Sequence, residues 1–563
     1  MTKKILSIIA VVMLMFSVTS CIQEIDPQTS TVTKDQVANA PGAFQNAVDA
    51  ITATLCGQFV YGGNSNKYPY DIGLPGFYLM RDVMGQDVVY YYQNWYSGWY
   101  VGSGLGPGTA RAQLPWTYYY KWIKSCNEVI SLAGEEPEED KIHGAGIAYC
   151  MRAFFYQDLA QMFAPETYAK NKNAETVPIV TEETALEDLA ANPRATNEAM
   201  WAFILEDLEK AEQYLEGYTR SDCYTPDKSV VYGLKARAYL IMEDWANAEK
   251  YAKLAQEGYT IMDEATYTSW ETGFNTPNGA WMLGMTYKAD DPNITINDAD
   301  SSWGSMMCME INPDQNVSGC GYAANYHQPF TIDRHLYETI PATDWRKKCF
   351  IDFAIDENTT QGSPERLAAL AAYTDHPDWI DLNWPHNQYP FLGGINMKFR
   401  TAGGEAGRNN QYIGFVMAVP MMRVEEMKLI EIEAAGMQNE SRGIQLLTEF
   451  AKTRDPQFTY NADDHNEAYG NSTTSAFRNA VWWQRRVEFW GEGLATHDIK
   501  RLSKGVIRNY AGTNHPEGYR QNTTTPPDRM AFCIVQTETN YNTACTNNPT
   551  PVPIAGDSPE FGW

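Results

Sequence analysis

The chain has 563 residues, of which 44% are hydrophobic and 20% are charged, and its net charge at pH 7 is −27. The hydrophobic fraction excludes an intrinsically disordered protein. The acidic charge argues against a nucleic-acid-binding protein, which needs a basic face, and against attachment to anionic lipid by charge alone. The length corresponds to several average domains, or to fewer if the protein is one large helical assembly.

The first 35 residues have the features of an export signal followed by a linker. An apolar run from Ile5 to Phe16 follows two lysines and is too short to span a bilayer. Val18-Thr19-Ser20-Cys21 resembles a bacterial lipobox, although Val18 and Ser20 depart from its commonest form. We therefore expect a lipoprotein signal peptide over 1–20, lipid attachment at Cys21 and a flexible tether over 21–35. An ordinary cleaved signal with a chance cysteine is the alternative.

The middle of the chain predicts paired helices. Asp227 can cap a helix with apolar residues at helical spacing, and a short turn precedes a second helix with Ala248, Ala252 and Ala255 on one face. The pair resembles a degenerate tetratricopeptide repeat, in which small alanines let two helices cross closely. Similar patterns occur at 118–132 and 201–215, and again at 424–435 and 441–452 with Gly436 between the last two. We therefore predict a predominantly all-α fold with minor β-structure.

We expect a single domain over residues 36–563, divided into a helical scaffold and an irregular cap. The scaffold is expected over about 36–58, 113–260 and 415–512, and the loop-rich cap over about 59–112, 261–414 and 513–563. The cap segments are rich in Gly, Asn, Asp, Pro and aromatic residues, and their periodicity is weak. Long irregular segments in a compact protein are usually functional loops.

The cysteines and the acidic clusters do not indicate a particular disulfide or metal site. Without Cys21, nine cysteines remain, so at least one thiol is free in a monomer. Cys308 could pair with Cys320, or Cys533 with Cys545, but we expect most cysteines to be small buried hydrophobes. We expect no cofactor. The sequence does contain a cluster that could hold calcium but is more typical of a solvated loop, namely Asp290, Asp291, Asn297, Asp298 and Asp300.

The most specific motif lies late in the chain. Gln484-Arg485-Arg486-Val487-Glu488-Phe489-Trp490-Gly491-Glu492-Gly493 is followed by Asp498-Ile499-Lys500-Arg501-Leu502. Its charges alternate in sign at helical spacing, which predicts an ion network that holds helices together. An acid–base role for Glu488 and Glu492 is a weaker interpretation. With the lipobox, the paired helices and the segment 157–163, this motif resembles the closing signature of SusD/RagB-type outer-membrane lipoproteins of Bacteroidetes, over essentially the whole chain.

The resemblance implies a fold, a function and partners. It implies tetratricopeptide-like hairpins in a non-catalytic, lipid-anchored protein at the cell surface. Such a protein captures oligo- or polysaccharide and passes it to a SusC-like TonB-dependent transporter of the outer membrane. A peptide-binding RagB-like import lipoprotein is the alternative. A secreted helical glycoside hydrolase, which needs two carboxylates about 5–10 Å apart, is less favoured because no recognised motif supplies them. A scaffold that binds only proteins is a third possibility.

Aromatic residues concentrate between Phe59 and Trp122, which hold 18 of them in 64 residues. On a glycine-rich loop they are not expected all to be buried, and an exposed Trp or Tyr ring suits the C–H face of a sugar. By resemblance, we expect ligand-binding residues in this segment and in the cap: Arg81, Asn94, Trp95, Tyr96, Trp99, Tyr287, Trp303 and Tyr326. The alternatives are that Trp95 and Trp99 are loop-core residues or contact the transporter, and that Arg81 and Asp82 form a structural pair.

Overall fold

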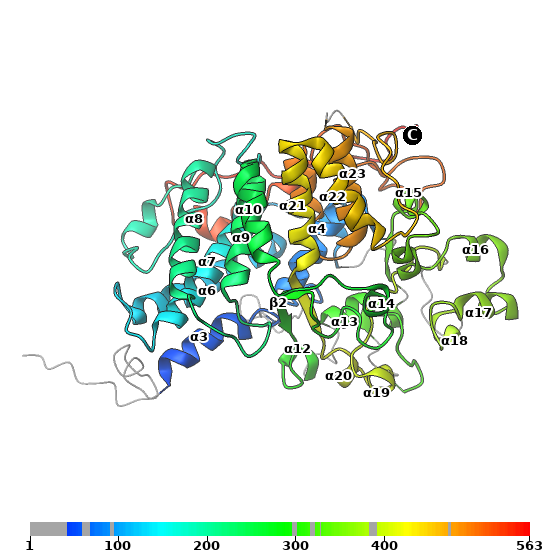
Figure 1. Cartoon of the computed structure of the whole chain (residues 1–563), viewed down its shortest axis with the longest axis horizontal. Coiled ribbons are helices and arrows are strands. Elements are labelled where there is room, and N and C mark those ends of the chain that lie inside the picture. Colours follow the sequence, from blue (N-terminus) through cyan, green and yellow to red (C-terminus); the bar gives the residue numbers. More distant parts are fainter. Residues whose placement is uncertain are drawn as a thin grey trace, which may run out of the picture. The chain divides into compact units, whose positions relative to one another are not determined.

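The computed structural model describes residues 42–58, 68–90, 95–295, 301–315, 321–326, 328–381, 391–470 and 474–563. Two of the predicted functional residues, Cys21 and Asn94, lie outside these ranges, as do Cys320 and three residues of the acidic cluster. Within them the protein is mainly helical, with two short two-stranded sheets, which confirms the predicted fold class (Figure 1). None of the described helices is both long and apolar enough to cross a membrane.

The chain divides into the units Met1–Asn46 and Ala47–Trp563. The described part of the first unit contains the beginning of helix α3 (Ala43–Ala53), which continues into the second.

Five long helices follow one another in the first half of this unit. They are α6 (Ala110–Ala133), α7 (Ile142–Phe163), α8 (Asn197–Tyr214), α9 (Lys228–Met242) and α10 (Trp245–Ala255). Each packs on the next. The side chains of Thr109, Thr196, Asp227 and Asp244 accept backbone N–H bonds at the starts of α6, α8, α9 and α10, as expected for N-caps. Local capping signals and apolar stripes therefore account for these helices.

A second helical group lies late in the chain. It comprises α21 (Val424–Gln438), α22 (Glu440–Lys452), α23 (Ala476–Glu488) and α24 (Ala495–Arg501). Figure 1 shows α21 beside α9 and α10, and α21 packs on α10. The predicted helix break at Gly436 is wrong, because α21 continues to Gln438. Gly436 is needed for a close approach instead: a Cβ there would lie 2.0 Å from the Phe477 ring.

The two sheets join distant segments. Strand β1 (Val88–Tyr90) pairs antiparallel with β3 (Phe330–Ile332), with Val88 opposite Ile332. Strand β2 (Trp281–Thr286) pairs antiparallel with β4 (Ala418–Arg423), which leads directly into α21. The first sheet holds the segment at residue 90 beside residue 330, and the second holds residues 281–286 beside residues 418–423.

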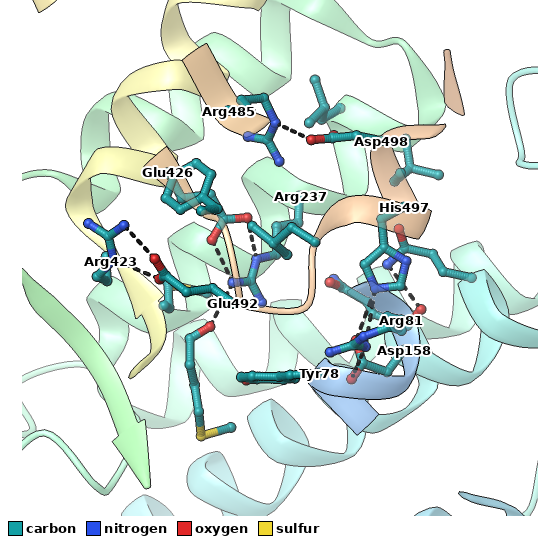
Figure 2. A pocket seen from close by; sticks show the side chains of 18 of the residues that line it. Tyr78, Arg81, Asp158, Arg237, Arg423, Glu426, Arg485, Glu492, His497 and Asp498 are labelled. Carbon is teal, nitrogen blue, oxygen red and sulfur yellow. Dashed lines mark hydrogen bonds and ion pairs between the residues drawn. The ribbon is translucent and has the colours of Figure 1, made fainter. Parts of the chain in front are cut away.

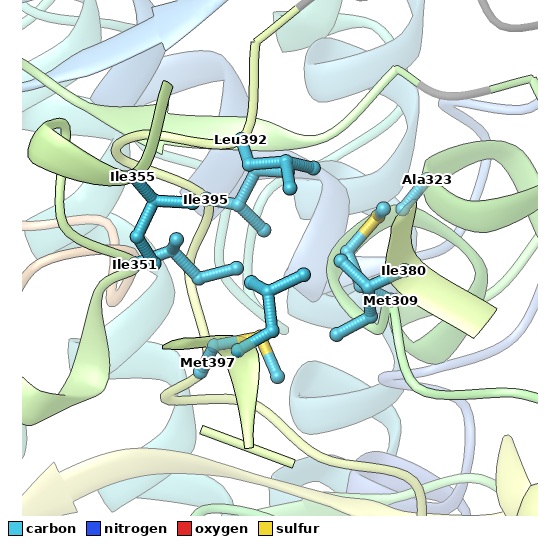
Figure 3. Close-up of a cluster of buried hydrophobic side chains, with 9 residues drawn as sticks. Met309, Ala323, Ile351, Ile355, Ile380, Leu392, Ile395 and Met397 are labelled. Atoms are coloured by element: carbon cyan, nitrogen blue, oxygen red, sulfur yellow. The ribbon is translucent and has the colours of Figure 1, made fainter. Parts of the chain in front are cut away.

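The remaining elements are short. The helices are α4 (Leu74–Met84), α5 (Ser97–Val101), α11 (Glu264–Tyr267), α12 (Pro292–Thr295), α13 (Trp303–Met307), α14 (Gly321–Asn325), α15 (Arg334–Thr339), α16 (Ala354–Asn358), α17 (Pro364–Leu370), α18 (Pro377–Asp381), α19 (Gly404–Arg408), α20 (Gln411–Gly414) and α25 (Gln536–Thr539). The 3₁₀ helices are η2 (Asp188–Ala191), η3 (Trp345–Cys349) and η4 (Asp528–Met530). Helices α14, α16 and α18 contribute Ala323, Ile355 and Ile380 to a small hydrophobic core (Figure 3).

The described cysteines are free thiols. Cys533 and Cys545 are both unpaired and buried, so the possible disulfide between them is not formed. Cys308 is also free. Cys223 is half-buried and the other described cysteines are buried, which agrees with the expectation of small buried hydrophobes.

Candidate functional site

The predicted late motif forms an interior ion network. Arg485 Nε donates to Asp498 Oδ2 at 2.7 Å (Figure 2). Arg501 Nε donates to the other oxygen of the same carboxylate at 2.7 Å. Arg501 also pairs with Glu433 of α21 at 2.6 Å. All four side chains are buried. The network therefore joins α21, α23 and α24, which confirms the structural role predicted for these charges.

Glu488 is the centre of a neighbouring part of this network. Its carboxylate lies 3.1 Å from Arg346, 3.3 Å from Arg423 and 3.1 Å from Arg454. Burial raises the pKa of Glu488, but these guanidinium groups outweigh burial and hold the pKa well below its usual range. A carboxylate kept ionised in this way is unsuited to general acid catalysis near neutral pH.

Arg81 belongs to the same interior region and not to the protein surface. Its Nη1 lies 2.9 Å from Asp158 Oδ2 and donates to His497 Nε2 at 3.2 Å (Figure 2). Burial lowers the pKa of His497 to about 4, so its ring is neutral at pH 7 and can accept this bond. The expected pairing partner, Asp82, instead accepts the backbone N–H of Gly493 at 2.9 Å. The structure thus gives Arg81 an interior ion pair with Asp158.

The cavity between these charged groups is small. Tyr78, Arg81, Asp158, Arg423 and Glu492 are among the side chains around it, and its volume is about 40 Å³. That is room for only a few water molecules, whereas ligand sites usually measure about 300–1,000 Å³. This cavity is therefore part of the internal packing and does not suit an oligosaccharide.

The aromatic segment forms a cluster around Tyr70. The Tyr70 ring centroid lies 5.1 Å from that of Tyr68 in a stacked arrangement, 5.1 Å from Trp99 and 6.5 Å from Tyr96 in edge contacts. Trp95 covers the cluster from outside, 6.2 Å from Tyr68 and 6.3 Å from Tyr70. Trp95 is 37% exposed, whereas Tyr96 and Trp99 are almost completely buried. The aromatic residues of this loop thus form a local core with one ring at the surface.

Arg111 adds a cation to this cluster and was not predicted from the sequence. Its guanidinium carbon lies 5.4 Å from the Trp99 ring centroid and 5.9 Å from that of Tyr70, within cation–π range. In the described part of the chain, Arg111 contacts rings and no carboxylate. Gly98 makes room for it, because a Cβ there would lie 2.5 Å from Arg111 Nε. The only sequence signal was a glycine-rich stretch before a helix, which does not identify a particular arginine.

The predicted residues of the cap are partly brought to this region. Tyr287 Oη donates to the carbonyl of Ile72 at 3.1 Å and accepts the backbone N–H of Trp303 at 3.2 Å. Both side chains are buried, and neither presents a ring to solvent. Tyr326 is half-buried and stacks on Tyr322 with centroids 5.2 Å apart. Among the described candidates, only Trp95 and Tyr326 therefore have substantial exposure, and the ligand roles of all of them stay predictions.

Comparison with known proteins identifies the fold. Residues 80–240 match the SusD-like family described as "Starch-binding associating with outer membrane". A curated relative from Formosa agariphila, "SusD-like protein P38", is 21% identical over 417 residues, which cover 72% of this chain and 75% of the relative.

Solved structures of SusD-like proteins have a similar fold. A SusD-like carbohydrate-binding protein from Bacteroides vulgatus superposes with a TM-score of 0.68 at 22% identity, covering 90% of this chain and 97% of that one. Surface glycan-binding protein A from Bacteroides thetaiotaomicron, in complex with laminarihexaose, gives a TM-score of 0.63 at 16% identity, covering 90% of this chain and 98% of that one.

The helical fold of this chain is therefore the fold of solved SusD superfamily proteins. The match of residues 80–240 to the SusD-like family and the similarity to a curated SusD-like protein confirm the resemblance seen in the sequence.

Proposed function

We propose that this protein is a non-catalytic carbohydrate-binding lipoprotein of a bacterial cell surface. It is anchored in the outer membrane through Cys21, captures oligo- or polysaccharide, and passes it to a TonB-dependent transporter. The description of the matching family, starch binding in association with the outer membrane, supports this proposal, as does the laminarihexaose bound to a protein of the same fold.

The observation that carries the proposal is the exposed indole of Trp95 on a buried aromatic base. Its neighbours Tyr68 and Tyr70 fix its position, so little side-chain entropy is lost when a ligand stacks on it. The face of a fixed indole suits the C–H face of a sugar ring. Arg111, beside the cluster, offers N–H donors for hydroxyl oxygens.

The test is a glycan array on the mature full chain, followed by calorimetric titration of each glycan that binds. Trp95→Ala should weaken binding about ten-fold or more, which corresponds to about 1.4 kcal/mol. Tyr541→Ala is the matched control, because Tyr541 is a similarly exposed aromatic residue, at 54%, outside the cluster. Equal affinities of wild type and Trp95→Ala would contradict the site.

The same preparation separates the alternative functions. Binding to members of a peptide panel and to no glycan would indicate a RagB-like peptide carrier, and release of sugars from a bound polysaccharide would indicate a hydrolase.

The proposed anchor and transporter need tests in the cell. Cys21→Ser should move the protein from the outer-membrane fraction to the soluble fraction. Affinity purification of the wild-type chain from detergent-solubilised membranes should retain a TonB-dependent transporter. If Cys21→Ser stays in the membrane fraction to the same extent as wild type, lipid attachment at this residue is wrong.

A further inference from the structure

A second cavity lies apart from the residues of the aromatic cluster. Its walls are the segment around α16 with Phe353 and Glu357, the residue Phe391, and the loop 512–520. Its volume is about 400 Å³, within the range typical of small-molecule sites. It shares no residue with the Trp95 cluster and none with the interior ion network.

The walls of this cavity are fixed to each other. Asn514 Oδ1 accepts the backbone N–H of Arg334 at 2.9 Å, and Asn514 Nδ2 donates to the carbonyl of Ile332 at 3.0 Å. The carboxylate of Asp356 accepts the backbone N–H of Leu392 at 2.9 Å. These intramolecular bonds thus hold the loop 512–520 and the residue next to Phe391 in place, so binding needs little reorganisation.

The lining combines rings with donors and acceptors. Phe353 and Phe391 contribute aromatic surface, and Phe391 is 48% exposed. Arg520 Nε donates to the carbonyl of His515 at 2.8 Å, and no described carboxylate lies within 4.0 Å of its guanidinium. Glu357 also lines the cavity and provides carboxylate oxygens. A hydroxyl group both donates and accepts, so a sugar can use the arginine and the carboxylate together.

The charges of the lining indicate which sugars fit. Asp356, Glu357 and Glu517 are acidic, whereas Arg334 and Arg520 are basic, so the lining carries one net negative charge. Arg334 pairs with Glu338 and Glu357, each at 2.7 Å, and Asp356 pairs with Arg366 at 3.1 Å. The two remaining charges, Glu517 and Arg520, are opposite in sign, so an anionic sugar gains no net attraction here and the lining suits a neutral sugar.

We propose that this cavity is a second carbohydrate site, which binds the end of a neutral oligosaccharide. The proposal rests on the proposed function, since it assigns a further site for the same class of ligand. Two sites on one chain would increase the affinity for a long polymer that reaches both. Short oligosaccharides would fill the two sites independently.

The test is calorimetric titration of the mature full chain with neutral hexasaccharides, namely laminarihexaose, cellohexaose and mannohexaose, and with an oligogalacturonate as the anionic comparison. We expect two binding events for at least one neutral hexasaccharide. Phe391→Ala and, as a second variant, Arg520→Met should each weaken one event about ten-fold, and Trp95→Ala should weaken the other. Thermal denaturation checks that each variant is folded, and Tyr541→Ala is the control.

The outcomes separate this proposal from the proposed function. A single event that Trp95→Ala abolishes and that Phe391→Ala and Arg520→Met leave unchanged would overturn the second site and support the first. Events sensitive to Phe391→Ala but not to Trp95→Ala would support the second site and contradict the first. If no neutral hexasaccharide gives an event sensitive to Phe391→Ala, or if oligogalacturonate binds there more tightly, the proposal is wrong.

Discussion

Asp87 and Arg486 are separated by 399 positions in the chain, yet their side chains meet inside the protein. Arg486 Nη2 donates to Asp87 Oδ1 at 2.6 Å and Nε donates to Oδ2 at 3.0 Å, so the contact is bidentate. Trp490 Nε1 also donates to the carbonyl of Asp87, at 2.8 Å. The late motif therefore holds the short segment between α4 and β1 against α23. These charges are buried and position the segment that leads into β1.

Replacing Glu488 by glutamine should strongly destabilise the protein. The substitution removes one of the carboxylate charges that compensate Arg346, Arg423 and Arg454, all of which are buried. Breaking a buried ion pair from one side typically costs about 3–5 kcal/mol. Urea denaturation followed by circular dichroism measures the change. Glu449→Gln, at an exposed position on α22, should change stability by less than about 0.5 kcal/mol. A loss below about 1 kcal/mol for Glu488→Gln would show that the network does not depend on this charge.

The pH dependence of stability should reveal Glu433. Burial alone would raise the pKa of this carboxyl, but Arg501 and Arg478 lower it from 4.5 to about 2. Because the folded-state pKa is depressed, the stabilisation is fully present above pH 4.5 and is lost as the pH falls from 4.5 towards 2. The shift corresponds to about 3 kcal/mol.

The measurement is the urea midpoint of wild type and Glu433→Gln between pH 7 and pH 2.5. The difference between the two proteins should be largest above pH 4.5 and should shrink below it. A difference that stays constant over the whole range would contradict the depressed pKa. The comparison cancels the titration of carboxyl groups shared by both proteins.

The sequence predicted the helices well because their signals are local. Asp227 and Asp244 cap the expected hairpin, and the alternating charges around Arg485 and Asp498 form the expected network. The family resemblance followed from this same late motif. These features depend on residues near each other in the chain or on helical spacing.

The site was harder to predict because it depends on long-range packing. Tyr96 and Trp99 were expected among the ligand-binding rings, with the core of the loop as the alternative for Trp99. Tyr70 and Arg111 cover both rings. Arg81 read as a ligand contact, but its partner Asp158 comes from α7. Which of many aromatic rings remains exposed is decided by segments that meet only in the folded chain. Sequence spacing contains no such information.

Gly443→Ala should destabilise the protein although alanine favours helices. A Cβ at this position of α22 would lie 2.3 Å from the Cα of Gly436 and 2.6 Å from the Phe477 ring. The backbone atom cannot give way, so α21 and α22 must separate. Overpacking of this kind costs about 1–3 kcal/mol, whereas the helix propensity of alanine offsets only about 1 kcal/mol. The melting temperature should fall. Ser441→Ala, at an exposed position of the same helix, should leave it unchanged or slightly raised.

Lys500 forms hydrogen bonds with the end of α7 and with Met530. Its Nζ donates to the carbonyl of Ala164 at 2.6 Å, to that of Met530 at 3.1 Å, and to that of Gln161. The last carbonyls of a helix have no partner within the helix, so a lysine here satisfies groups that would otherwise be buried unpaired. Lys500→Met keeps the apolar stem and removes the donor. We expect a loss of about 2–4 kcal/mol in the free energy of unfolding.

The pH profile distinguishes this contact from simple packing. Burial lowers the pKa of Lys500 to about 7 from its usual 10.5. Between these values the unfolded chain binds more protons at this position than the folded protein does, so the wild type gains stability as the pH rises from 7 to 10.5. Lys500→Met lacks this gain, and Lys452→Met, at the exposed end of α22, should retain it. Urea midpoints at pH 6, 8 and 10 measure how stability changes with pH. Parallel pH profiles for wild type and Lys500→Met would contradict the lowered pKa of Lys500.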